Sequence, residues 1–197
     1  GNLTQAYSIA AEGSGFKEAF VDDADMRKLM SKYESQCDDL HTDLHECLGH
    51  GSGQLLPGVL PDALKAYGNT IEEARADLFG LYYVADQKLV DLGLTPNLEA
   101  YKSQYYTYMM NGLMTQLVRI KPGNNIEEAH MRNRALIANW TLEHYPEAVQ
   151  LVKKDSKTFV QITDYQLLRT AFAKLLAEIQ RIKSEGDFEA ARSLVEE

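Results

Sequence analysis

Apolar residues recur every three or four positions along much of the chain, the spacing expected for one face of an α-helix. The clearest run extends from Asp25 to His50. Its apolar positions are Met26, Leu29, Met30, Tyr33, Cys37, Leu40, Leu44, Cys47 and Leu48. Gly51-Ser52-Gly53 follows directly and predicts the end of the helix. The pattern therefore predicts one long amphipathic helix early in the chain.

The same periodicity predicts further helices, whereas the first twenty residues show no clear pattern. The predicted helices run from about Ile71 to Leu92, Leu98 to Ile120, Ile126 to His144 and Tyr165 to Ser184, with a short last helix after Asp187. Asn69 or Thr70 is the expected cap of the first of these. Between 149 and 162, two β-branched runs flank the polar segment Lys153 to Lys157 and predict a small hairpin. We therefore expect a mainly α fold, a single helical domain of about five to six helices over residues 1–197 with a possible small β-hairpin near 149–162.

Composition and charge narrow the possible functions. The chain has 197 residues, 45% of them hydrophobic, and carries a net charge of −9, which argues against nucleic acid as a partner. No apolar run is long enough for a membrane span, and the start lacks the features of a signal peptide. Gly1 in place of Met is typical of an expression scar or of a cut from a longer chain, and we expect a piece of a longer protein. We expect a cytoplasmic protein, with a secreted or periplasmic parent still open.

The two cysteines are expected to be free thiols. Cys37 and Cys47 are ten residues apart on one predicted helix, about 15 Å along its axis. That separation is too large for a disulfide, whose Cα atoms lie within about 7 Å. Free thiols fit a reducing compartment but do not establish one.

The segment His45-Glu46-Cys47-Leu48-Gly49-His50 carries the candidate chemistry. The zinc-hydrolase pattern His-Glu-x-x-His places both histidines on one helix face, but here they are five residues apart. Positions five apart on a regular α-helix point about 140° apart. Both rings can bind one metal ion only if the helix widens locally, as in a one-residue π-bulge, or ends early. Gly49 stands where such a distortion would be least costly.

Catalytic zinc takes three protein ligands and leaves one position for water. His45 and His50 supply two nitrogens. Glu46 adjoins His45 and cannot easily bind the same ion, but it can accept a proton from the bound water. The third ligand must therefore come from another segment.

The best source of that ligand is the run Glu72-Glu73-Ala74-Arg75-Ala76-Asp77. Acidic residues in the first turns of a helix are also explained by capping and by the helix dipole, which is the commoner explanation for such a run taken alone. Because the chain also has the histidine motif, we favour a metal site over helix capping as the explanation for these acidic residues. Glu73 and Asp77 are four apart on one face, so one could bind metal while the other orients a histidine through its free N–H.

A rival pair has the ordinary four-residue spacing. His41 and His45 could hold a metal ion without any bulge. No glutamate follows His41, so such a site would lack an obvious base. We favour the pair His45 and His50, and we expect His41 to support the site or to lie at the surface.

At these residues the sequence resembles the dipeptidyl peptidase III family of zinc exopeptidases. That family carries His-Glu-x-x-x-His and a second motif, Glu-Glu-Cys-Arg-Ala-Glu/Asp, which residues 72–77 match except at Ala74. The resemblance implies one Zn²⁺ per chain held by His45, His50 and Glu73, with Glu46 as the general base. It also implies that Glu72 and Asp77 are outer partners of the ligating histidines.

A third segment, Ala129 to Arg134, looks like a stretch of the family that faces its cleft. The resemblance implies that His130 stabilises the oxyanion or positions substrate, and that Arg134 lies in the cleft.

Family members are two-lobed enzymes several times longer than this chain. The resemblance therefore implies the zinc-bearing helical part of one lobe, whose partners are the remainder of its parent chain and short peptides that lose N-terminal dipeptides. The alternative is a helical interaction domain with a structural or degenerate metal site, inactive as an isolated fragment.

Overall fold

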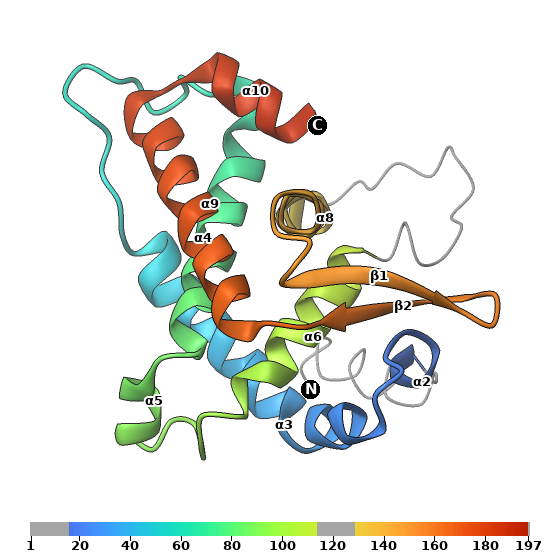
Figure 1. The fold of residues 1–197 in the computed structure, drawn as a ribbon. Coiled ribbons are helices and arrows are strands. Elements are labelled where there is room, and N and C mark those ends of the chain that lie inside the picture. Colours follow the sequence, from blue (N-terminus) through green and yellow to red (C-terminus); the bar gives the residue numbers. More distant parts are fainter. Residues whose placement is uncertain (1–15, 114–128, 197) are drawn as a thin grey trace, which may run out of the picture.

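The computed structural model describes residues 16–113 and 129–196. In this part of the chain it has eight α-helices, one π-helix and one two-stranded antiparallel sheet, so the predicted mainly α fold is confirmed (Figure 1). The α-helices are α2 (Phe16–Phe20), α3 (Ala24–Leu44), α4 (Gly68–Val84), α5 (Gln87–Asp91), α6 (Tyr101–Gly112), α8 (Ala129–His144), α9 (Tyr165–Glu185) and α10 (Phe188–Glu196). The remaining elements are the π-helix η1 (His45–His50), a 3₁₀ turn (Lys65–Tyr67), and the strands β1 (Val149–Lys154) and β2 (Lys157–Ile162).

Helix α4 is the central element. It packs against α3, η1, α8 and α9, and Figure 1 shows α9 lying along it. Buried residues occupy all sides of α4 rather than one stripe, as expected for a helix enclosed by others. They include Ile71, Ala74, Leu78, Leu81 and Val84.

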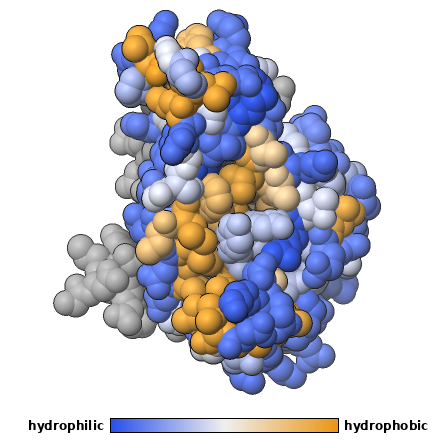
Figure 2. Space-filling model, turned by 90° about the vertical axis from the view of Figure 1, so that its left-hand side faces the viewer, coloured by the Kyte–Doolittle hydropathy of each residue, from blue (hydrophilic) through white to orange (hydrophobic). Residues whose placement is uncertain are grey.

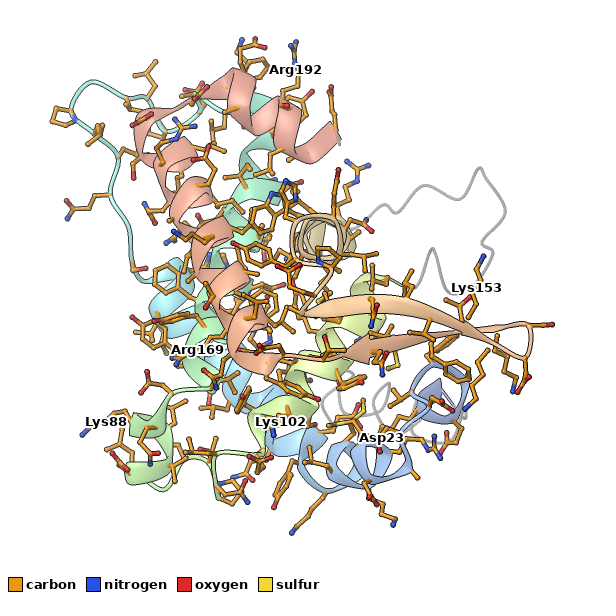
Figure 3. All side chains as sticks on the ribbon, in the orientation of Figure 1. Asp23, Lys88, Lys102, Lys153, Arg169 and Arg192 are labelled. Atoms are coloured by element: carbon orange, nitrogen blue, oxygen red, sulfur yellow. The ribbon has the colours of Figure 1, made fainter. Side chains whose placement is uncertain are left out.

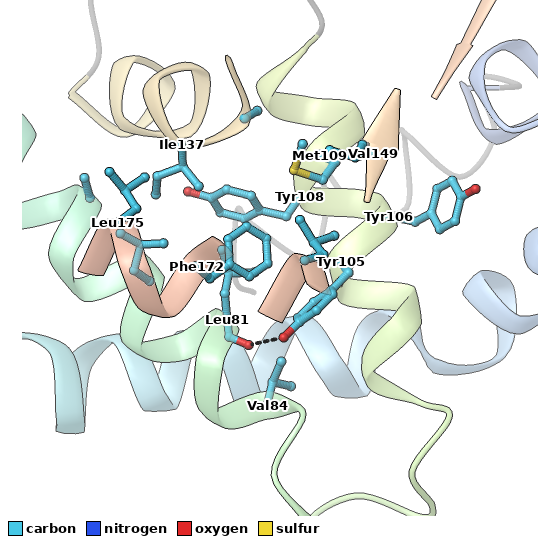
Figure 4. Close-up of a cluster of buried hydrophobic side chains, with 14 of the residues drawn as sticks. Leu81, Val84, Tyr105, Tyr106, Tyr108, Met109, Ile137, Val149, Phe172 and Leu175 are labelled. Atoms are coloured by element: carbon cyan, nitrogen blue, oxygen red, sulfur yellow. Dashed lines mark hydrogen bonds between the residues drawn. The ribbon is translucent and has the colours of Figure 1, made fainter. Parts of the chain in front are cut away.

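Helix α6 fills the core with aromatic side chains. Tyr105 is fully buried and its ring meets the Phe172 ring edge-on at 5.1 Å between centroids (Figure 4). Its hydroxyl donates to the Leu81 carbonyl at 3.0 Å, so the buried polar group is satisfied. Charged residues lie mostly at the periphery, where Lys88, Lys153 and Arg192 are exposed (Figure 3).

The predicted helix from Ile71 to Leu92 is wrong in one respect, because it is two helices. Helix α4 ends at Val84, and Asp86 adopts an extended conformation with φ −83° and ψ 134°. The Asp86 side chain accepts a hydrogen bond from the Lys88 amide at 2.9 Å and caps α5. The predicted caps of α4 are also wrong, since Asn69 and Thr70 lie within the helix and no side chain caps it.

The predicted hairpin is confirmed. Its strands pair from Val149 with Ile162 to Lys154 with Lys157. The turn is shorter than expected, since only Asp155 and Ser156 lie between the strands, both at positive φ as a two-residue hairpin turn requires.

The remaining helices largely follow the prediction. Helix α9 ends at Glu185 and is followed by Gly186, whose φ of 67° is the left-handed conformation favoured after a helix. Asp187 caps α10 by accepting a hydrogen bond from the Ala190 amide. The predicted helix ends near Ile120 and Ile126 lie outside the described residues. No helix among the described residues is long and apolar enough to span a membrane.

Candidate metal centre

Helix α3 passes directly into the π-helix η1 at His45. A π-helix has i→i+5 hydrogen bonds, so residues five apart come close to one face. Nε2 of His45 and Nε2 of His50 lie 3.0 Å apart, with the two rings nearly perpendicular. The predicted local widening of the helix is therefore confirmed, and it brings the two imidazoles to one point.

Close packing against α4 explains the glycine in η1. A Cβ atom at Gly49 would lie 2.6 Å from both Cα and Cβ of Ala76, so only glycine permits this approach. Gly49 is not among the glycines with positive φ, so the structure adds a steric reason for glycine at this position. The close approach sets the histidines of η1 over the acidic residues of α4.

Arg75 ties the end of η1 to α4. Its side chain is fully buried, and Nη2 donates to the carbonyl oxygens of Gly49 at 2.6 Å and Ser52 at 3.0 Å. These bonds hold carbonyl groups at the end of the π-helix and just beyond it. The same guanidinium donates through Nε and Nη2 to both carboxylate oxygens of Glu72, each at 3.0 Å. Arg75 therefore fixes the helix end and one acidic side chain together.

Asp77 orients His45 from beneath the site. Its Oδ1 lies 2.7 Å from Nδ1 of His45. Its Oδ2 accepts hydrogen bonds from the Tyr108 hydroxyl at 2.8 Å and from Nδ2 of Asn133 at 2.6 Å. Burial alone raises the pKa of Asp77, but the hydrogen bond with His45 and neighbouring basic side chains outweigh burial and hold it at about 2. Asp77 is therefore ionised. Its Oδ1 accepts a hydrogen bond from the N–H at Nδ1 of His45.

Glu72 orients His50 in the same way. Its Oε1 lies 2.9 Å from Nδ1 of His50, and Lys183 and Arg75 also donate to its carboxylate. Burial raises the pKa of Glu72, but these hydrogen bonds lower it by more, so the pKa is about 2. Each imidazole therefore donates from Nδ1 to a carboxylate and turns the lone pair of Nε2 toward the other ring.

Two further carboxylates complete the cluster. Oε2 of Glu73 is 3.4 Å from Nε2 of His45, and Oε1 is 3.8 Å from Nε2 of His50. Glu46 also contributes, since one ligand-type atom each of His45, Glu46 and His50 lies within 4.8 Å of the others. Glu46 and His50 are exposed, so the cluster faces the surface on that side.

The donor set fits a divalent cation such as zinc. Ligand atoms around a tetrahedral zinc ion with bonds of about 2.0–2.1 Å lie roughly 3.3 Å from one another. The separations among His45, His50 and Glu73 run from 3.0 to 3.8 Å. Two lone pairs and a carboxylate at such distances repel one another unless a positive charge lies between them. Burial lowers the pKa of His45, but the nearby carboxylates raise it by more, so the site attracts positive charge.

His41 does not supply a ligand here. Gln104 donates from Nε2 to Nδ1 of His41 at 3.0 Å, so the proton of the neutral imidazole is on Nε2. That Nε2 lies 3.1 Å from the Asp77 carbonyl oxygen, to which it donates. Both ring nitrogens are occupied, and the rival pair of His41 and His45 is not supported. His41 instead lies buried beneath the site.

His130 and Arg134, the two candidate cleft residues on α8, are described to different extents by the structure. The backbone of His130 belongs to the first turn of α8, but its side chain lies outside the described residues. The Arg134 side chain is half-buried, and its charge contributes to lowering the pKa of Asp77. The predicted roles of His130 and Arg134 in the cleft remain predictions.

Two residues of the site were missed from the sequence. Tyr108 lies in an apolar, tyrosine-rich helix, and Asn133 lies between two arginines. Tyr108 carries no motif, and Asn133 falls in the segment Ala129 to Arg134, where only His130 and Arg134 were singled out. The contacts of Tyr108 and Asn133 with Asp77 join residues 31 and 56 positions apart.

Two comparisons with known proteins identify the family of this chain. The family model of peptidase family M49 matches residues 2–64 and 58–197. The structure of dipeptidyl-peptidase III from Corallococcus sp. strain EGB is similar, with a TM-score of 0.68 and 25% sequence identity over 92% of this chain. The chain covers 31% of that protein. These findings confirm the resemblance seen in the motifs and show that the chain belongs to peptidase family M49.

Proposed function

We propose that this chain is the zinc-binding part of an exopeptidase that releases dipeptides from the N-termini of short peptides. The observation that carries the proposal is the convergence of Nε2 of His45, Nε2 of His50 and the Glu73 carboxylate on one point beside Glu46. His45, His50 and Glu73 would hold the ion. Asp77 and Glu72 keep both Nε2 lone pairs directed at it.

In the proposed reaction, Glu46 moves the proton. Zinc, when bound, supplies a Lewis acid that polarises the scissile carbonyl and lowers the pKa of water. Glu46 lies on the exposed side of the cluster, where it can take a proton from the attacking water and return it to the leaving amine. His130 is the candidate for stabilising the oxyanion, on the strength of the family resemblance alone.

The proposal also assigns a partner, the remainder of a longer parent chain. This chain spans about a third of the similar dipeptidyl-peptidase III structure. Hydrophobic side chains gather in patches on the face seen in Figure 2, which includes the loop after η1 and α5, both at the left of Figure 1. Exposed leucines lie in the loop after η1 and in the stretch that follows α5. They are Leu56, Leu60, Leu92, Leu94 and Leu98. Exposed apolar patches typically mark interfaces, so we expect parts of the parent chain to cover them.

Zinc content tests the metal assignment. The purified 197-residue chain should bind one zinc ion, and His50→Ala should reduce the bound zinc to background. The matched control is His144→Ala, because His144 is exposed at the end of α8 and its ring stacks on Trp140. Absence of zinc from the unaltered chain would favour a helical interaction domain over an enzyme.

Activity tests the catalytic assignment and needs the parent enzyme. Glu46→Ala in the parent should retain zinc and lose dipeptide release by several orders of magnitude, since the general base is absent. An active, zinc-loaded Glu46→Ala enzyme would refute the role of Glu46. The isolated chain should release no dipeptides, because it lacks most of the protein that it resembles.

A further inference from the structure

Three helices meet at the carboxylate of Asp77. The residue itself lies on α4, while the two donors to its Oδ2 come from α6, through Tyr108, and from α8, through Asn133. Tyr108 is 2% exposed and Asn133 is 0% exposed. Their connection with the metal centre runs through Asp77.

The two hydrogen bonds to Oδ2 hold the Asp77 carboxylate in one orientation. With Oδ2 engaged twice, rotation of the carboxylate would break two buried hydrogen bonds, a cost larger than that of losing one. Oδ1 therefore stays directed at Nδ1 of His45. The amide of Asn133 is fixed as well, because the flipped amide would place its Oδ1 against a carboxylate oxygen. The hydrogen-bond chain consequently selects the tautomer of His45 that has its proton on Nδ1.

We propose that Tyr108 and Asn133 are positioning residues that set the tautomer and the orientation of His45 through Asp77. They thereby hold the Nε2 lone pair ready for a metal ion. The effect on the metal rests on the proposed function, whereas the effect on the tautomer is a property of the metal-free chain.

The chain offers a matched control three residues away. Tyr105 lies on the same helix, is equally buried, and donates its hydroxyl to the Leu81 carbonyl instead of to Asp77 (Figure 4). Tyr105→Phe and Tyr108→Phe each remove one buried hydroxyl and one hydrogen bond. Only the second change alters the support of Asp77, so a general loss of stability and a loss of positioning can be separated.

The first test reads the tautomer by ¹⁵N NMR of histidine side chains in the metal-free chain, at alkaline pH where neutral imidazole is favoured. In the unaltered chain and in Tyr105→Phe, His45 should be the Nδ1–H tautomer. In Tyr108→Phe and in Tyr108→Phe/Asn133→Leu, the Nε2–H tautomer should become detectable, most clearly in the double variant. An unchanged tautomer in both variants would overturn the inference.

The second test measures the dissociation constant of zinc by competition with a chromogenic chelator. We expect affinity to fall about 3–10-fold in Tyr108→Phe and further in the double variant. The single variant should thus lose less than the 10–100-fold typical of direct partners of ligating histidines, because Tyr108 acts through Asp77. Tyr105→Phe should bind zinc as the unaltered chain does. Equal weakening in both Tyr→Phe variants would contradict the positioning role. If even the unaltered chain binds no zinc, the proposed function fails, and the tautomer measurement still decides the inference.

Discussion

Nε2 of His45 lies 3.0 Å from Nε2 of His50 although five residues separate them, because the helix between them is a π-helix packed closely on α4. The distance depends on two contacts of η1 with α4, at Gly49 and at Arg75. Each contact can be changed separately.

Gly49→Ala should damage both the fold and the metal centre. The added Cβ would lie 2.6 Å from the Ala76 backbone, which cannot yield as a flexible side chain would. We expect a loss of about 1–3 kcal/mol in the free energy of unfolding, typical of overpacking, and weaker zinc binding. Urea unfolding and zinc competition provide the measurements.

The control for that change is Gly68→Ala in the first turn of α4. A Cβ there meets only Leu64 Cβ at 3.8 Å, an ordinary contact. Alanine is also the better helix former by roughly 0.5–1 kcal/mol, so this variant should be no less stable than the unaltered chain. Equal stability of Gly49→Ala and Gly68→Ala would show that η1 does not depend on the close approach.

Arg75→Met should leave Glu72 without its main buried partner. The buried Arg75 guanidinium donates to several acceptors, and a methionine side chain supplies none of these hydrogen bonds. Breaking such a buried pair typically costs about 3–5 kcal/mol, and we expect the lower part of that range because a quarter of the Glu72 side chain is exposed. Zinc affinity should fall too, since Glu72 orients His50.

Arg181→Met serves as the comparison for Arg75→Met. Arg181 makes ion pairs with Glu178, Glu185 and Asp187, but these lie at the surface, where solvent screens them. Thermal unfolding should show little change, and zinc binding should show none. If Arg75→Met behaves like Arg181→Met in both measurements, the anchoring role of Arg75 is wrong.

The two cysteines should differ sharply in reactivity. Both are free thiols, as the sequence predicted, but Cys47 is exposed and Cys37 is buried. Burial raises the pKa of the Cys37 thiol to about 11, so its reactive thiolate is scarce at neutral pH. A disulfide reagent should titrate one thiol rapidly in the native chain and two in denaturant. Cys47→Ser should abolish the rapid phase, and a persisting rapid phase would contradict the burial of Cys37.

The cap at Asp86 should make a small contribution to acid sensitivity. The hydrogen bond from the Lys88 amide, followed by that from Arg169, lowers the pKa of Asp86 in the folded chain. The resulting stability is present above the unfolded pKa of about 3.9 and is lost as the pH falls through the lower folded pKa. Asp86→Asn keeps the capping oxygen but cannot titrate. The difference in unfolding free energy between the two chains should therefore shrink below about pH 4, and a constant difference would refute the prediction.

Local pattern in the sequence was enough for most of the helices, the hairpin and the widened helix of the histidine motif. Helical periodicity, β-branched runs and turn residues act over a few neighbouring positions, so each leaves a local signal. The spacing of His45 and His50 is likewise a local geometric constraint. It required a departure from α-helical bonding if both rings were to meet, and η1 has that departure.

Tertiary structure decided what the local pattern left open. Capping and metal binding were both compatible with Glu72 and Glu73, and only the packing of η1 on α4 turned their carboxylates toward the histidines. The break before Asp86 was hidden because apolar spacing continues across it, and the roles of Tyr108 and Asn133 depend on helices distant in sequence. Such contacts arise from the arrangement of α3, α4, α6 and α8 around a shared core. No residue spacing within one segment encodes them.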